Sequence, residues 1–289
     1  MRLIEQRESL REEGGQRMKK TNRTLSVLVA ATVLATALTG CGWLDKMPEK
    51  LELSMIGEGS GSGELVSTGS GAYAAEDVDA IEVKGEALAI YVTRSDSDQA
   101  EVELLLDRQI HNKVKFKSEL KSGTLQLDVK ENSRTIGDDQ RGERRLTIAL
   151  PEKTYDRLRV TNAFGRIEVQ EIAAERVEVK LDAGQIVLDR VTGQIDARTE
   201  AGEVVMQGLV LTDDVTAKTS VGKVTVGLIE PPAAARVSLS SELGSVRSEL
   251  EGLDIQEQSG RKLVGAIGSG GPKLTLQSEV GEVELKIER

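Results

Sequence analysis

The chain has 289 residues, a net charge of −10, one cysteine and only 2% aromatic residues. A single cysteine cannot form an internal disulfide, so packing must hold the fold, and the core must be aliphatic. Residues 1–40 hold seven Lys/Arg and four Asp/Glu, so the remainder carries −10 − 3 = −13. This acidity, with so few aromatic side chains for base stacking, argues against nucleic acid as a partner.

The beginning of the chain has the pattern of an export signal. Residues 25–38 form a short uncharged run, which is preceded by Lys19, Lys20 and Arg23. A bilayer span needs about 20 residues, whereas a shorter apolar run after basic residues is typical of a secretory signal. The run ends in Leu38-Thr39-Gly40-Cys41, which resembles the lipobox of bacterial lipoproteins. We therefore expect residues 18–40 to be a lipoprotein signal peptide and Cys41 to be the lipid-attachment site.

The segment before Met18 does not fit such a signal. Glu12 to Gly15 would be encoded by purine-rich codons of the kind found in a ribosome-binding site, a few codons before Met18. We expect Met18 to be the true start and residues 1–17 to be a mis-called leader, the alternative being a genuine long n-region. A diacylglyceryl group on Cys41 would anchor the chain to the membrane, outside the cytoplasm, since two acyl chains hold a protein there stably.

Residues 41–76 are predicted to be a flexible tether. The run from Gly57 to Gly63 and the triplet Gly69-Ser70-Gly71 are rich in glycine and serine, and such sequences form flexible linkers. This tether would lift a folded domain, residues 77–289, away from the membrane.

From residue 77 onward, apolar residues alternate with polar ones, which predicts half-buried β-strands. The polar run from Glu131 to Arg145 is expected to be a loop between two of them. The expected strands are centred on Ile81–Val83, Leu88–Val92, Val102–Leu106, Val114–Phe116, Leu125–Val129 and Leu146–Leu150.

A repeat follows Pro151, in which a glycine is followed two residues later by Ile or Val. The first five of these glycines recur at nearly equal intervals. A unit of about 19 residues with two short strands fits one coil of a β-solenoid, because each coil buries its inward side chains only by stacking on its neighbours. The glycine would turn the corner between the two strands. The glycines are Gly165, Gly184, Gly202, Gly222, Gly244 and Gly281.

The outward positions of the repeat are polar, which favours pairing in a single register. An antiparallel β-sandwich alternates in the same way and is the alternative fold. The repeat is interrupted between Gly252 and Pro272, where we expect a surface loop, after which residues 274–287 would close the structure. The outward residues are Glu168, Glu178, Lys180, Asp196, Arg198, Lys223, Glu282 and Glu284.

Two stretches carry a resemblance to known families. Residues 148–151 (IALP) with 158–167 (LRVTNAFGRI) resemble the bacterial "putative adhesin" β-strand-repeat family of unknown function. Residues 79–85 (DAIEVKG) with 90–93 (IYVT) are similar to the related head domain of autotransporter adhesins. The resemblance implies a right-handed β-solenoid at the cell envelope and brings no catalytic residues with it.

No catalytic or metal constellation is predicted. The only histidine, His111, lies in a polar segment and is expected at the surface. The acidic pairs Asp96/Asp98, Asp138-Asp139 and Asp213-Asp214 lack the spacing of a calcium loop, so solvated turns are the favoured interpretation over a weak Ca²⁺ site. With one histidine and one lipidated cysteine, a transition-metal site is not expected, and neither is a cofactor.

The leading functional hypothesis is a non-enzymatic module for binding, adhesion or envelope-stress sensing, with a wall polymer or an envelope protein as partner. The alternative is a carbohydrate-active β-helix resembling a polysaccharide lyase or hydrolase. Such sites present clustered carboxylates with aromatic rings, and no aromatic residue follows Phe164.

Overall fold

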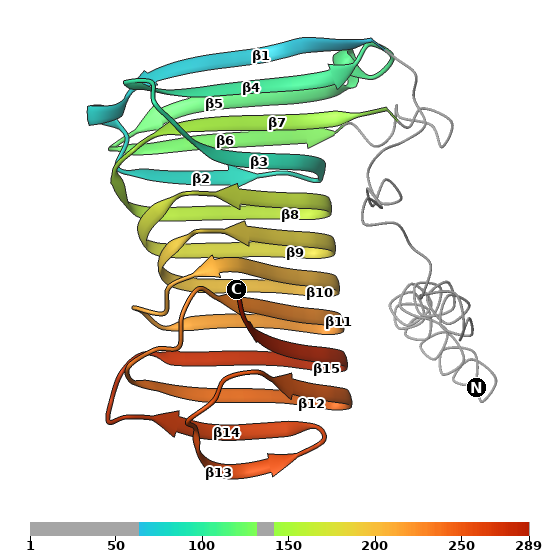
Figure 1. Ribbon diagram of the computed structural model, residues 1–289. Helices are drawn as coiled ribbons and strands as arrows, with labels where there is room; N and C mark the ends of the chain where they lie inside the picture. The colour runs from blue at the N-terminus through green and yellow to red at the C-terminus, as the bar shows by residue number, and fades with distance from the viewer. Residues whose placement is uncertain (1–63, 132–141, 289) are drawn as a thin grey trace, which may run out of the picture. The chain divides into compact units, whose positions relative to one another are not determined.

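The computed structural model describes residues 64–131 and 142–288, which belong to one compact unit and are nearly all β (Figure 1). The predicted leader, signal peptide and Cys41 lie outside the described residues. The strands before the repeat are β1 (Leu65–Ala74), β2 (Ala80–Lys84), β3 (Ala87–Ser95), β4 (Gln99–Asp107), β5 (Val114–Lys121), β6 (Thr124–Glu131) and β7 (Arg144–Pro151). The repeat contains β8 (Thr154–Gln170), β9 (Ala173–Asp189), β10 (Thr192–Leu209), β11 (Val215–Leu228), β12 (Ala235–Ser248), β13 (Asp254–Ser259), β14 (Lys262–Ile267) and β15 (Lys273–Ile287). The 3-10 turns are η2 (Ala75–Asp77) and η3 (His111–Lys113).

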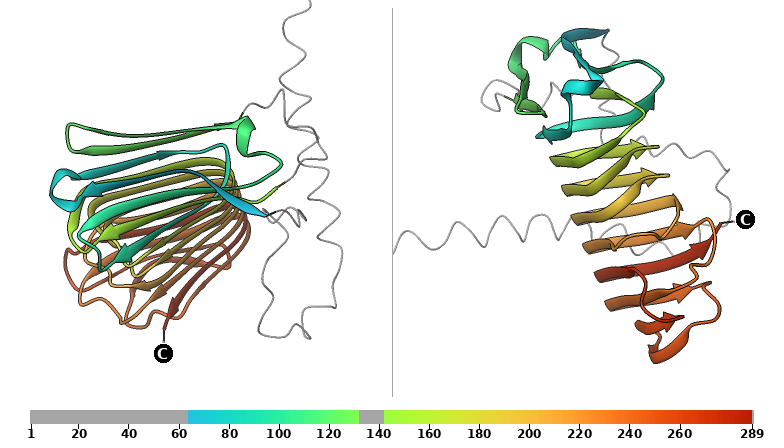
Figure 2. Two further views of the ribbon diagram at one scale, coloured as in Figure 1. Left: turned by 90° about the horizontal axis from the view of Figure 1, so that it is seen from above. Right: turned by 90° about the vertical axis from the view of Figure 1, so that its left-hand side faces the viewer.

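Each long strand of the repeat forms one coil with two arms that meet at a glycine. In β8, residues 157–161 pair with β2, whereas residues 164–170 pair with β3. The coils stack in parallel, so the first arms form one face of the solenoid and the second arms form another (Figures 1 and 2). We call these the first face and the second face.

The register confirms the β-solenoid and not the antiparallel sandwich. Gly165 lies beside Gly184, Gly184 beside Gly202 and Gly202 beside Gly222, so one coil extends from each corner glycine to the next. Side chains that point inward from the two arms fill a single aliphatic core. In β9, for example, this core receives Val177 and Val179 from the first arm and Ile186 and Leu188 from the second.

The corners confirm the predicted role of glycine. Gly184, Gly202 and Gly222 have φ values of 135°, 134° and 139°, a region that favours glycine. A Cβ atom on any of them would overlap the carbonyl oxygen of the corner glycine in the preceding coil. Several buried hydroxyl groups near the corners satisfy these carbonyl groups: Ser278 Oγ donates to Gly222 O (3.0 Å), and Ser241 Oγ donates to Gly281 O (2.8 Å).

The end of the stack that precedes β8 is closed by antiparallel strands. β6 and β7 continue the two faces, β5 pairs with β6, β4 pairs with β7, and β1 pairs with β4. Tyr73 of β1 and Ser118 of β5 join across this end through their hydroxyl groups (2.5 Å). The expected loop does lie between β6 and β7, although residues 132–141 are outside the described residues.

Two expectations from the sequence were wrong. The tether was predicted to reach residue 76, but the sheet already begins with β1 at Leu65. The glycine-rich composition concealed this strand. At Gly69 a side chain would overlap the ring of Phe116, so glycine is needed for packing at this position rather than for flexibility.

The second error concerns the other end of the stack. The segment predicted to be a surface loop forms the β13–β14 hairpin, which extends the first face beyond β12. β15 does not close the stack but lies between β11 and β12, in parallel with both. Its C-terminal end is held on both sides by backbone hydrogen bonds, from Glu288 N to Leu228 O (2.8 Å) and from Glu249 N to Leu285 O (2.9 Å).

Candidate functional site

The outward residues of the first face form four rows along the stack. Alternate residues of a strand point to the same side, and the parallel register places equivalent residues of successive coils beside each other. In β9 the four outward residues are Arg176, Glu178, Lys180 and Asp182, which define rows 1 to 4. Row 4 is nearest the corner glycine.

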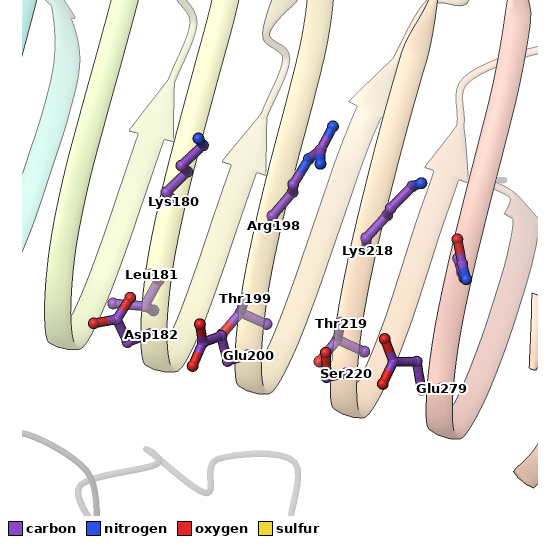
Figure 3. Close-up of a pocket in the computed structure, with 11 residues that line it drawn as sticks. Lys180, Leu181, Asp182, Arg198, Thr199, Glu200, Lys218, Thr219, Ser220 and Glu279 are labelled. Atoms are coloured by element: carbon purple, nitrogen blue, oxygen red, sulfur yellow. The ribbon is translucent and has the colours of Figure 1, made fainter. Parts of the chain in front are cut away.

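Row 3 contains a stripe of cations. Lys180, Arg198 and Lys218 occupy it in three consecutive coils, and each lies four residues before a corner glycine. They line a shallow groove with a volume of about 430 Å³, in which their side chains extend in the same direction (Figure 3).

Row 4 places carboxylates along the corner side of the same groove. Asp182, Glu200 and Glu279 contribute them, with Ser220 between Glu200 and Glu279 (Figure 3). The groove therefore carries parallel rows of opposite charge. No aromatic side chain is among the residues that line it.

Most of these charges are not neutralised within the molecule. Arg198 is the exception in the groove, because Asp196 accepts two hydrogen bonds from its guanidinium group (2.6 and 2.7 Å) and raises its pKa. Outside the groove, Glu178 of row 2 forms an ion pair with Arg159 of the preceding coil. Among the described residues, the other charged groups of the groove have no ion pair or side-chain hydrogen bond. These groups are Lys180, Asp182, Lys218, Glu200 and Glu279.

The charges of the second face are paired more completely. Arg166 donates to Gln185 of the next coil, and Gln185 Nε2 donates to Glu203 Oε2 of the coil after it (3.1 Å). Lys223 Nζ lies 2.9 Å from Glu284 Oε2, and this contact raises the pKa of Lys223 and lowers that of Glu284. The second face thus uses its charges to hold neighbouring coils together.

An apolar ridge follows the corner between the two faces. Each coil has an apolar residue directly before its corner glycine, and these residues lie in register. Four of them are among the exposed large apolar residues of the described chain. They are Phe164, Val221, Val280 and Leu243.

The sequence-predicted candidates do not converge on a site. His111 is exposed, and its Nδ1 lies 2.7 Å from the carbonyl oxygen of Arg108. Asp214 accepts a hydrogen bond from the backbone N–H of Lys273 (2.7 Å), and Asp96 and Asp98 are exposed at a turn. The pair at 138–139 lies outside the described residues. Within the described ranges, no group of three or more His, Cys, Asp or Glu could hold a metal ion.

Sequence reasoning identified only part of the groove. Lys180 and Arg198 were assigned to outward positions, whereas Lys218, Asp182, Glu200 and Glu279 were missed. The missing signal was the fixed distance to the corner glycine, which is four residues for the cations and two for the carboxylates. In the described part of the chain, no helix has the length and apolar character of a membrane span.

The chain is therefore an open β-solenoid with a charged groove on one face. It belongs to the Toastrack DUF4097 family, whose model matches residues 78–191 and again residues 156–286. No curated protein matches the sequence.

Three solved structures illustrate its structural neighbours. One is a "putative cell adhesion protein" from Clostridium sporogenes, with 12% identity and a TM-score of 0.49, covering 78% of this chain and 100% of its own. Another is a "putative adhesin" from Bacteroides fragilis, with 11% identity and a TM-score of 0.31, covering 78% and 98%. A third is a "putative lipid binding protein" from Parabacteroides distasonis, with 11% identity and a TM-score of 0.32, covering 79% and 98%. These neighbours are named for adhesion or binding rather than for a catalysed reaction.

Proposed function

We propose that this chain is a lipid-anchored, extracytoplasmic and non-enzymatic binding module, and that the first face is its binding surface. The anchor would be the diacylglyceryl group on Cys41, and the residues before β1 would be the tether. The observation that carries the proposal is the contrast between the two faces. The second face pairs its charges between coils, while the groove of the first face keeps Lys180, Lys218 and their neighbouring carboxylates available for a partner.

The charge pattern favours an envelope protein over a wall polymer as the partner. An anionic polymer would be attracted by row 3 but repelled by the carboxylates of row 4, which lie in the same groove. A protein surface can present both signs in matching rows, and such complementarity provides specificity. The carbohydrate-active alternative has less support, because the groove offers no aromatic ring for stacking on a sugar.

Site-specific photo-crosslinking in intact cells would test the binding surface. A crosslinker at Ser220, inside the groove, should give covalent adducts with a protein, whereas one at Thr225 on the second face should not. The adducts at position 220 should disappear when Lys180 and Arg198 are both changed to glutamate. Equal adducts at both positions, or none at position 220, would contradict the proposal.

A second measurement separates a protein partner from a polymer partner. The purified full-length chain is sedimented with isolated cell wall, with and without the K180Q/R198Q double change. We expect retention to be weak and equal for the two proteins. Strong retention that is lost in the double variant would mean that the first face binds a wall polymer instead.

The anchor has its own test. Replacing Cys41 by serine should prevent lipidation, so the protein should accumulate as uncleaved precursor or be shed from the cell. A C41S protein that still fractionates with membranes at the mature size would contradict lipid attachment at Cys41.

A further inference from the structure

The rows of the first face have a sign symmetry that is visible within single coils. From row 1 to row 4, β9 presents Arg176, Glu178, Lys180 and Asp182, which are alternately positive and negative. Reading the rows in reverse order therefore inverts every sign. A surface with this property is complementary to a copy of itself turned by a half rotation.

The required rotation axis is defined by the rows. It runs parallel to the stack, between rows 2 and 3, and brings row 2 of one copy over row 3 of the other and row 1 over row 4. In β9, Glu178 would face Lys180 of the second copy and Arg176 would face its Asp182. In β10, Asp196 would face the second copy's Arg198.

The same pairing extends to the coils at the far end of the stack. In β15, Lys273 of row 1 would face Glu279 of row 4, and in β12 Arg236 of row 1 would face Glu242 of row 4. Among the described outward residues from β2 to β12, this rotation brings no two like charges opposite each other. Beyond β6 the complementarity ends, since Lys121 and Lys115 of β5 would oppose each other.

We propose that the partner of the first face is a second copy of this chain, in a parallel two-fold dimer. This inference rests on the proposed function, because it names the partner of the same binding surface. An antiparallel dimer, in which the two stacks run in opposite directions, is disfavoured. Its two-fold axis would run parallel to the strands, so row 3 of one copy would lie over row 3 of the other and bring cations together. In the parallel arrangement both copies have β1 at the same end of the stack.

The size of the surface is adequate for a reversible dimer. Seven strands from β2 to β12 form it, and at about 4.8 Å between strands they span roughly 29 Å. Rows 1 to 4 span six residue steps at about 3.3 Å each, or roughly 20 Å. The contact is therefore about 600 Å² per copy, at the lower end of specific interfaces. Membrane attachment of both copies raises their local concentration and so favours such a contact.

A charge-exchange experiment tests the dimer with the full-length chain. One variant, E178K/D196K, makes row 2 positive, and a second, K180E/R198E, makes row 3 negative. Each variant by itself would place like charges across the interface, but a mixed pair would restore opposite charges. Copies with two different affinity tags are co-expressed, solubilised from membranes and co-purified at low salt.

We expect wild-type copies to co-purify. The amount of co-purified partner should fall at least about tenfold for each variant alone, and the mixed pair should regain most of it. The signal should also be lost at 1 M salt, where screening acts within about 3 Å. The matched control Q207K/T225K adds two charges to the second face without removing a member of its ion pairs, and should co-purify like the wild type. Circular dichroism of each variant checks that its β structure is retained.

Two results would overturn the dimer: wild-type copies that do not co-purify, or a mixed pair that does not recover. If wild-type copies fail to co-purify while crosslinks from position 220 reach a different protein, the dimer is wrong and the proposed function stands. If crosslinks from position 220 are also absent, both are wrong.

Discussion

At the scale of single residues, the corner glycines are the most constrained positions of the fold. Gly202 has a φ of 134°, and a Cβ atom at this position would overlap the carbonyl oxygen of Gly184. Gly252 has a φ of 75° but nothing within 4 Å of the place where a side chain would begin. A substitution at Gly252 therefore introduces backbone strain alone, whereas a substitution at Gly202 introduces both backbone strain and steric overlap.

Replacing Gly202 by alanine should lower the free energy of unfolding more than replacing Gly252 by alanine does. Backbone strain alone costs about 1–3 kcal/mol at either position, and at Gly202 the overlap with Gly184 adds to it. Chemical denaturation of the two variants and the wild type measures the difference. Equal decreases in the free energy of unfolding for the two variants would mean that Gly202 does not lie close to the carbonyl oxygen of Gly184.

Lys223 and Glu284 on the second face give a prediction about pH. Lys223 lowers the pKa of Glu284 below its ordinary value of 4.5 in the folded protein, mainly by a hydrogen bond. Its contribution to stability is therefore complete above pH 4.5 and is lost as the pH falls through the lower folded pKa. Because both side chains are partly exposed, we expect less than about 1 kcal/mol.

The K223Q variant should accordingly be slightly less stable than the wild type at pH 7 and equally stable at about pH 2. Denaturation at both pH values tests this, and K218Q serves as the control because it removes a lysine that has no ion pair. A K223Q deficit that is unchanged at low pH would rule out the ion pair as its origin.

At the scale of elements, the order of the coils was the feature that the sequence predicted least well. Alternation and glycine spacing sufficed to predict β2 to β7 and the coils and corners of the repeat, but not β1 or the β13–β14 hairpin. They did not predict that β15 enters between β11 and β12, because all these coils share one pattern and any of them can pair in parallel with another. The path of residues 249–272 determines which coils lie beside β15. The glycine-rich composition of this segment had predicted a loop.

Disulfide trapping distinguishes the two coil orders. Thr216 of β11 lies beside Thr275 of β15, and Thr275 lies beside Ser238 of β12. Neighbouring strands are about 4.8 Å apart, within the Cα separation that a disulfide tolerates, whereas strands two positions apart are too distant. T216C/T275C should form an intramolecular disulfide and T216C/S238C should not. The opposite result would mean that the coils stack in chain order.

The groove shows the same limit of sequence reasoning at the scale of the whole molecule. The alternating charges of residues 176–182 are visible in the sequence, but their role depends on which coils lie beside β9. Only the register aligns Lys180 with Arg198 and Lys218, and Asp182 with Glu200. The lipid anchor, by contrast, remains a prediction from Cys41 and the preceding run alone.

The most direct test of the account is the distance between two copies at both ends of the first face. Spin labels are attached to cysteines introduced separately at Thr161 in β8 and Ser238 in β12, in full-length protein reconstituted into membranes. Both positions lie next to the proposed axis, so in a parallel dimer each pair of labels should be separated by about the 10 Å between packed sheets, plus the label arms. An antiparallel pair over the same seven strands would add roughly 19 Å of stack at Thr161 and roughly 29 Å at Ser238. Long distances at both positions, or no dipolar coupling at all, would contradict the parallel dimer.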